Sequence, residues 1–182
     1  MTDTRVLVLV GSLRADSLNR RIAETIRNQA PAGVSVEIVD GLETLPFYNE
    51  DLDGAEAPAS AAALRARVAE ADRVLAVTPE YNGTMPAVLN NAIDWLSRPF
   101  GQGAIKGKPF AVVGATPTPY GGKWAHEDTR RSARIAGAQV VEDVVVSQSA
   151  LEGDILADPE VVGRLVAAVQ TLAAYEPETA AA

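Results

Sequence analysis

Short apolar runs separated by stretches of helical periodicity make up most of this chain. The first run, 6–10, contains only valine and leucine, which is typical of a strand buried on both faces of a sheet. Similar runs follow at 34–39, 74–77, 110–113 and 140–146, the last interrupted by Glu142 and Asp143. Between them, apolar residues recur with helical spacing over 17–30, 59–71, 86–97, 123–136 and 159–175. The pattern predicts five strands that alternate with five helices.

This alternation is typical of βαβ units with right-handed crossovers and helices on both faces of a parallel sheet. We therefore predict the α/β class, as a three-layer sandwich around a five-stranded parallel sheet of order 2-1-3-4-5. In that order the winding reverses between strands one and three, so the loops after these strands should border a ligand crevice. We expect one domain over 1–182, with 176–182 as a frayed, alanine-rich tail.

The composition excludes several kinds of chemistry. The 182 residues include no cysteine and a single histidine, His126, which excludes thiol catalysis, disulfides and multi-histidine zinc sites. A formal net charge of −8 disfavours nucleic acid and anionic membranes as partners. No apolar run reaches the roughly 18 residues of a membrane span, and the first run is too short for a secretion signal. We expect a soluble cytoplasmic protein that works with few side chains or with a bound cofactor.

The segment after the first predicted strand carries groups suited to an anion. Arg14 supplies a planar cation, and short polar donors lie around it at Ser12, Ser17 and Asn19. The start of the following helix adds free backbone N–H groups, so the segment could cradle a phosphate. The plainer alternative is that Asp16 or Ser17 only caps the helix and Gly11 only makes a turn. The segment matches neither the Walker A nor the G-x-G-x-x-G pattern.

The segment after the third predicted strand, 79–86, has the composition of a sharp turn. Asn82 and Gly83 readily adopt positive φ, and Thr84 could cap the helix that follows. Such a turn could hydrogen-bond the edge of a flat heterocycle, with Tyr81 adding contact area. An ordinary turn before a helix is the alternative.

Four other features receive structural interpretations. The glycine-rich segment 101–108 precedes a strand, so we place it at the opposite edge of the sheet rather than at a phosphate. The acidic stretch 41–58 is interpreted as a solvated loop, with a flap near the site or a partner subunit as the alternative. His126, near a helix start, is expected at the surface rather than as a proton donor. Trp95 and Leu96 are expected in the core.

Taken together, 11–20, 79–83 and 90–97 resemble the NADPH-dependent FMN reductase family of flavodoxin-like proteins, which includes reductases of quinones, azo dyes, chromate and free flavin. The resemblance runs from the first strand to the last helix. It implies FMN as cofactor, NADPH or NADH as hydride donor, a small-molecule electron acceptor, and a homodimer or homotetramer that pairs the region of Trp95. It implies no metal and no side chain acting as catalytic acid or base, because a flavin carries the hydride transfer itself.

The resemblance also implies which residues contact FMN. The phosphate would be held in the first segment, by Ser12, Arg14, Ser17, Leu18 and Asn19. The isoalloxazine ring would lie along the second, at Pro79, Glu80, Tyr81, Asn82 and Gly83. A third contact would come from Thr116 and the loop up to Lys123, where two prolines and a lysine replace the family's more glycine- and serine-rich stretch ending in arginine.

We expect an oxidoreductase that passes a hydride from NAD(P)H through FMN to a quinone, azo compound, free flavin or similar acceptor with ping-pong kinetics. The alternatives are a flavodoxin-type electron carrier without nicotinamide turnover, whose acidic surface would suit docking to basic redox partners, and a flavin-bound sensor without turnover.

Overall fold

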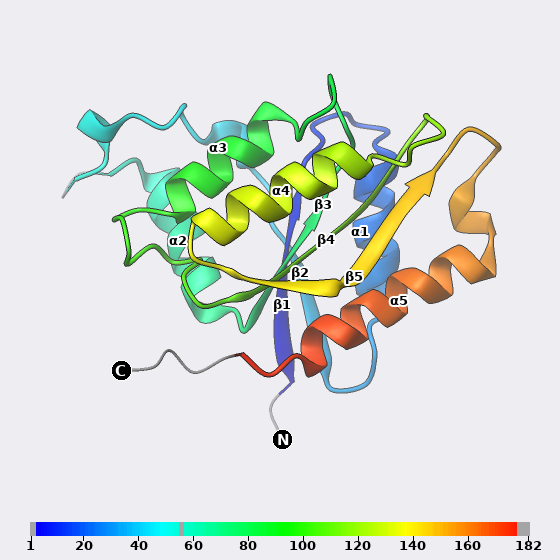
Figure 1. Ribbon diagram of the computed structural model, residues 1–182. Coiled ribbons are helices and arrows are strands. Elements are labelled where there is room, and N and C mark those ends of the chain that lie inside the picture. Colours follow the sequence, from blue (N-terminus) through cyan, green and yellow to red (C-terminus); the bar gives the residue numbers. More distant parts are fainter. Residues whose placement is uncertain (1–2, 55–56, 178–182) are drawn as a thin grey trace.

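The computed structural model describes residues 3–54 and 57–177, and its centre is a five-stranded parallel sheet (Figure 1). The strands are β1 (Thr4–Val10), β2 (Val34–Ile38), β3 (Arg73–Val77), β4 (Pro109–Thr116) and β5 (Gln139–Ser149). Their order is β2-β1-β3-β4-β5. Both the α/β class and the flavodoxin-like strand order predicted from the sequence are confirmed.

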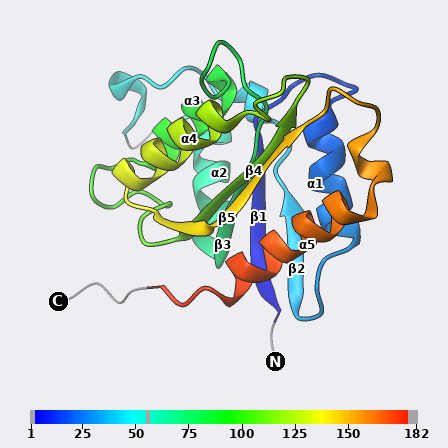
Figure 2. The ribbon, with the colours of Figure 1, turned by 45° about the vertical axis from the view of Figure 1, so that its right-hand side comes forward.

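Helices cover both faces of this sheet (Figure 2). One face carries α1 (Leu18–Asn28) and α5 (Pro159–Ala174), and the other carries α2 (Ala59–Glu70), α3 (Ala87–Leu96) and α4 (Lys123–Ile135). Short 3₁₀ helices lie at Leu42–Thr44, Glu50–Leu52 and Ile155–Ala157. No helix within the described residues is long and apolar enough to cross a membrane.

The central strands are apolar over most of their length because both of their faces are buried. In β1, Val6 and Val8 pack in the cluster under α1 and α5, whereas Leu7 and Leu9 pack in the cluster under α2 and α3. Successive side chains of a strand point to opposite faces, so a sheet covered on both sides needs an apolar residue at every position.

The two acids in β5 are accommodated by an irregular register. Between the pairs Phe110 with Val140 and Val112 with Val145, β5 contains extra residues, and Glu142 and Asp143 are both exposed. A bulge of this kind lets neighbouring side chains face solvent together. The acids therefore do not interrupt the strand, which runs through them as predicted.

The structure corrects in part the interpretation of the stretch 41–58 as a solvated loop, because many of its described residues are exposed but some are packed in the core. Leu42 and Leu45 are buried in the core, and the Trp95 indole Nε1–H donates to the Pro46 carbonyl at 2.8 Å. Arg65 donates to both carboxylate oxygens of Asp53, at 2.7 and 2.9 Å, and its guanidinium lowers the pKa of that carboxyl. Residues 55 and 56 of the stretch lie outside the described residues.

Other expectations about the fold hold. Trp95 and Leu96 are buried in the chain's own core. The glycine-rich segment 101–108 leads into the start of β4, at the edge opposite to the loops that follow β1 and β3. The last helix ends at Ala174, and 178–182 of the predicted tail lie outside the described residues.

One glycine of β4 allows the carboxyl ends of the strands to approach closely. A Cβ atom on Gly114 would lie 2.1 Å from the Thr78 carbonyl oxygen, 2.9 Å from Asn19 Oδ1 and 3.0 Å from His126 Nε2. The first of these neighbours is backbone, which cannot move aside without disturbing β3. Any side chain at this position would therefore push the segments apart.

We expect Gly114→Ala to lower the free energy of unfolding by about 3 kcal/mol, the upper part of the usual range for overpacking a core. Gly163→Ala is the matched control, because Gly163 is exposed in α5 and nothing lies within 4 Å of its added Cβ. That change should be neutral or stabilising by up to about 1 kcal/mol, through helix propensity. Urea unfolding of both variants measures the difference, and equal stabilities would contradict the close approach.

Candidate functional site

Three loops meet at the carboxyl edge of the sheet, after β1, β3 and β4. We call 11–17 the first loop, 78–86 the second loop and 117–122 the third loop. Their parent strands are neighbours in one parallel sheet, so all three leave the same edge. The amide of Gly11 donates to the carbonyl of Val77 at 2.9 Å, which joins the first and second loops at their bases.

The first loop holds a set of hydrogen-bond donors. The backbone amides of 12–16 make no hydrogen bond within the part of the chain that the structure describes. The Ser17 hydroxyl is buried and accepts the Arg20 amide at 3.2 Å, which caps α1 and leaves its own proton free to donate. Arg14 is exposed and makes no ion pair with the described residues. Free amides, a hydroxyl, a guanidinium and a helix start together suit a phosphate.

Asn19 joins the first loop to β4. Its side-chain amide donates to the Ala115 carbonyl at 2.9 Å, and its Oδ1 accepts the Ala115 amide at 3.0 Å. The side chain is buried, and its two hydrogen bonds to Ala115 resemble those that a neighbouring strand would make with β4. Its backbone amide lies in the first turn of α1, before the first intrahelical bond, and points to the same end as the amide of Leu18.

The second loop makes the sharp turn predicted from its sequence. Asn82 has φ +54° and Gly83 has φ +76°, and the amides of Tyr81 and Thr84 each donate to the other's carbonyl, at 3.0 and 3.1 Å. Two successive positive φ values are the signature of a tight type I′ turn. The predicted cap is wrong: Thr84 donates to the Asp128 carboxylate in α4, and the start of α3 has no side-chain cap. The bond from Thr84 lowers the pKa of Asp128.

Glu80 joins the second loop to α4. One of its carboxylate oxygens accepts the amides of Trp124 and Ala125, both at 3.1 Å. These amides belong to the first turn of α4, whose own N-cap residue, Gly122, has no side chain to accept them. The carboxylate thus caps a helix more than forty residues away and complements its dipole.

The third loop lies against the second. Thr116, at the end of β4, is buried, and its hydroxyl is 2.9 Å from that of Thr118. A Cβ on Gly122 would lie 3.2 Å from Thr116 Cγ2 and 3.9 Å from Glu80 Cβ, and its φ of +84° suits glycine. The structure therefore brings together the three segments that carry the sequence-predicted site residues.

His126 is buried, so the expectation of a surface residue is wrong. Its Nδ1 is 2.6 Å from the Ser147 hydroxyl and its Nε2 is 3.3 Å from the Thr78 carbonyl. A carbonyl can only accept, so Nε2 carries the proton and Nδ1 accepts from Ser147. Burial lowers the pKa of His126 to about 4, with a smaller opposing effect from the Thr78 carbonyl. The neutral ring thus links α4 to the start of the second loop by a hydrogen bond.

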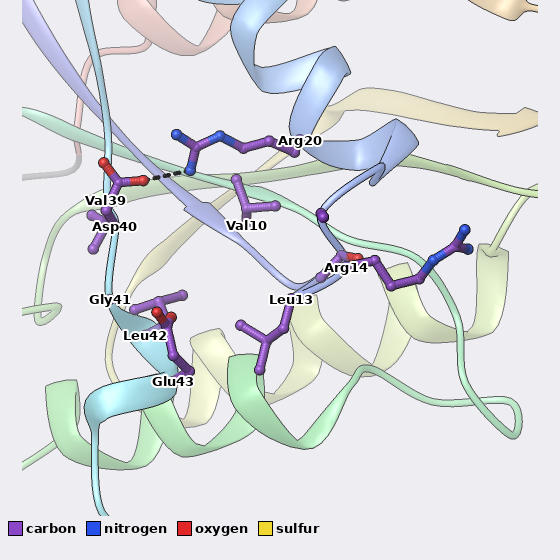
Figure 3. A pocket seen from close by; sticks show the side chains of 11 residues that line it. Val10, Leu13, Arg14, Arg20, Val39, Asp40, Gly41, Leu42 and Glu43 are labelled. Carbon is purple, nitrogen blue, oxygen red and sulfur yellow. Dashed lines mark hydrogen bonds and ion pairs between the residues drawn. The ribbon is translucent and has the colours of Figure 1, made fainter.

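The first loop also lines a hollow on its β2 side (Figure 3). The hollow encloses about 430 Å³ between the first loop and 39–43, a segment that includes the start of the stretch 41–58, interpreted from the sequence as a solvated loop or a flap. Arg20 reaches to Asp40 at 2.5 Å, whereas Arg14 extends away from these side chains (Figure 3). Arg14 is therefore free of the ion pair that neutralises Arg20.

Two titratable side chains at this edge serve to hold the loops. His126 is neutral and enclosed, and the Glu80 oxygen that faces α4 is engaged by two amides. Among the described residues no group of three or more His, Asp or Glu side chains is placed to hold a metal ion. The arrangement can bind an anion at the first loop and a flat ring along the second.

Comparisons with known proteins agree with this geometry. The family model for NADPH-dependent FMN reductase matches residues 4–152. The quinone reductase of Pseudomonas putida is 44% identical over 127 residues, 70% of this chain and 68% of that protein. The 2-hydroxy-1,4-benzoquinone reductase of a Burkholderia species is 46% identical over 112 residues, 62% of this chain and 60% of that protein, less than two thirds of its length.

A solved structure gives similarity over nearly the whole chain. FerB of Paracoccus denitrificans, described as a flavoenzyme NAD(P)H:(acceptor) oxidoreductase, superimposes with a TM-score of 0.80 at 33% identity. The match covers 93% of this chain and 97% of that one.

His126 is the only histidine, so its titration can be followed directly by NMR. We expect no change of its imidazole signal between pH 7.5 and 5, because burial holds its pKa near 4. The unfolded chain binds this proton near pH 6.5, so stability is lost as the pH falls from about 6.5 to 4, by about 3 kcal/mol. His126→Gln should lack this component in parallel unfolding series. A midpoint near pH 6.5 in the folded protein would contradict the burial.

Proposed function

The chain belongs to the NADPH-dependent FMN reductase family, and we propose that it reduces a quinone with electrons from NADPH or NADH. Membership of the family makes it an oxidoreductase with FMN as cofactor and a nicotinamide as donor. The observation that carries the proposal is the meeting of the first, second and third loops at one edge of the sheet.

The overall reaction balances as NAD(P)H plus one proton plus quinone, giving NAD(P)⁺ and hydroquinone. Bound FMN supplies the hydride acceptance and the onward delivery of two electrons. The protein's task is then to bind and orient, which agrees with a site built from backbone amides and neutral side chains.

We place the FMN phosphate at the first loop. Arg14 provides the charge, and the other donors are the Ser17 hydroxyl with groups of Ser12, Leu18 and Asn19. Because the Asn19 side chain is paired with Ala115, its backbone amide is the donor that faces the start of α1. The amides of 12–16 support this placement, since no acceptor among the described residues engages them and they can donate to a bound anion.

We place the isoalloxazine ring along the second loop, from Pro79 to Gly83. Thr116 would provide a third contact to the cofactor. The turn at Asn82 and Gly83 holds the backbone rigidly, and Tyr81, which is 47% exposed, adds a flat surface. Glu80 and His126 both tie this loop to the start of α4. Rigid backbone donors support tight placement of a ring edge.

Quinones are favoured among the acceptors because the relatives at 44% and 46% identity are named as quinone reductases. The same names do not favour a carrier without nicotinamide turnover. Azo compounds and free flavin remain acceptors to assay beside quinones. A homodimer or homotetramer remains a prediction, which sedimentation equilibrium checks.

The proposal is tested on purified protein loaded with FMN. We expect anaerobic NADPH or NADH to bleach the flavin absorption directly, and a benzoquinone or naphthoquinone to restore it. Steady-state rates at several fixed quinone concentrations should give parallel double-reciprocal plots. Flavin that neither donor reduces would contradict the proposal, and a flavin that stops at a stable semiquinone would favour the carrier.

Arg14→Gln should weaken FMN binding by about 10-fold or more, the usual effect of losing one charge-assisted hydrogen bond. Arg27→Gln is the matched control, because Arg27 is exposed in the last turn of α1, at the end away from the first loop. Quenching of flavin fluorescence on binding gives both dissociation constants. Equal affinities in the two variants would contradict the placement of the phosphate.

A further inference from the structure

Two aromatic rings and one cation form an exposed cluster at the third loop. The rings of Tyr120 and Trp124 have centroids 4.7 Å apart, and they are 54% and 40% exposed. The Lys123 ammonium lies 5.0 Å from the centroid of Trp124 and 5.9 Å from that of Tyr120. We call these three residues the aromatic platform.

Two features of the aromatic platform are unfavourable for stability, although its ring–ring and cation–π contacts are favourable. Lys123 is the first residue of α4, at the end of the helix where the dipole disfavours a cation. It makes no ion pair within the described part of a chain whose net charge is −8. Two large aromatic side chains also remain in contact with water. Local departures of this kind concentrate at functional sites.

The aromatic platform is fixed beside the second loop. The Trp124 amide donates to Glu80, and Gly122 lies between Glu80 and Thr116. Trp124 also borders a hollow of about 500 Å³ that Gly83 and Thr84 line from the other side. A flat molecule approaching a ring on the second loop therefore has room against the Trp124 indole.

The charges around Trp124 would determine how a charged ligand is oriented on this surface. The hollow is lined by Glu127, Asp128 and Arg131, and the Arg131 guanidinium is paired with the Asp128 carboxylate. Lys123 is the cation that contacts the aromatic faces. A ligand with an anionic group would therefore direct that group to Lys123 and lay its ring against the indole.

We propose that the aromatic platform binds the electron acceptor and selects a quinone that carries an anionic group, such as an ionised hydroxyl, a carboxylate or a sulfonate. The quinone ring stacks against Trp124 and Tyr120, and the anionic group pairs with Lys123. This inference rests on the proposed function and adds to it the charge class of the acceptor.

Binding is tested first, without turnover. The chain has two tryptophans, of which Trp95 is fully buried and Trp124 is exposed, so quenching of exposed indole emission reports on the aromatic platform. FMN-loaded protein without NADPH is titrated with 1,4-naphthoquinone-2-sulfonate and with uncharged 1,4-naphthoquinone. We expect saturable quenching by the sulfonate, and its loss in Trp124→Phe.

Lys123→Met tests the charge. We expect the dissociation constant for the sulfonate to rise about 10-fold and that for the uncharged quinone to change less than 2-fold. Lys106→Met is the matched control, because Lys106 donates to the Gly101 carbonyl at the opposite edge of the sheet and should change neither. Equal changes for both quinones in Lys123→Met would overturn the proposal.

A kinetic comparison distinguishes the acceptor from the donor. In Lys123→Met we expect kcat/KM to fall about 10-fold for the sulfonate alone, with KM for NADPH unchanged. A raised KM for NADPH with both quinones unaffected would overturn the proposal, because Lys123 would then bind a dinucleotide phosphate. If the wild type oxidises no NADPH with any quinone, the proposed function fails, and selective binding of the sulfonate in the titration still decides the aromatic platform.

Discussion

The carbonyl oxygen of Thr78 is the point around which the carboxyl edge of the sheet is assembled. It lies where a side chain on Gly114 would have to sit, and the Nε2–H of His126 donates to it. The Thr78 side chain in turn occupies the space beside Gly11. Only because two glycines leave this space free can the loops after β1, β3 and β4 come together. The site therefore depends on backbone packing before it depends on any reactive side chain.

The polar groups at this edge mostly serve to hold the loops. Asn19 pairs with β4, Glu80 caps α4, and His126 remains neutral in the core. These bonds satisfy buried or helix-terminal groups that would otherwise destabilise the fold, and they also fix the loops in place. Within the described residues, the amides of 12–16 and the Arg14 guanidinium have no such partner, and the aromatic platform is exposed to solvent. A family that relies on FMN for its chemistry needs such a rigid frame with free donors at its surface.

The sequence was sufficient for the elements and their order, and less so for the contacts between them. Continuous apolar runs such as 6–10 identify strands buried on both faces, and the helical periods between them imply the parallel sheet. The turn at Asn82 and Gly83 was also predictable, because positive φ is a local property. The burial of His126 and the bond from Thr84 to Asp128 were not, since each depends on residues far along the chain. Glu80 shows the same limit, because nothing near it in sequence indicates that it caps α4.

The central claim is that the three loops jointly hold one FMN molecule, and a crystal structure of the complex with FMN tests it most directly. The account predicts phosphate oxygens within hydrogen-bond distance of the Ser17 hydroxyl and the amides at the start of α1, with the ring along Pro79 to Gly83. An FMN bound instead in the hollow between the first loop and 39–43, or with its ring away from the second loop, would contradict it.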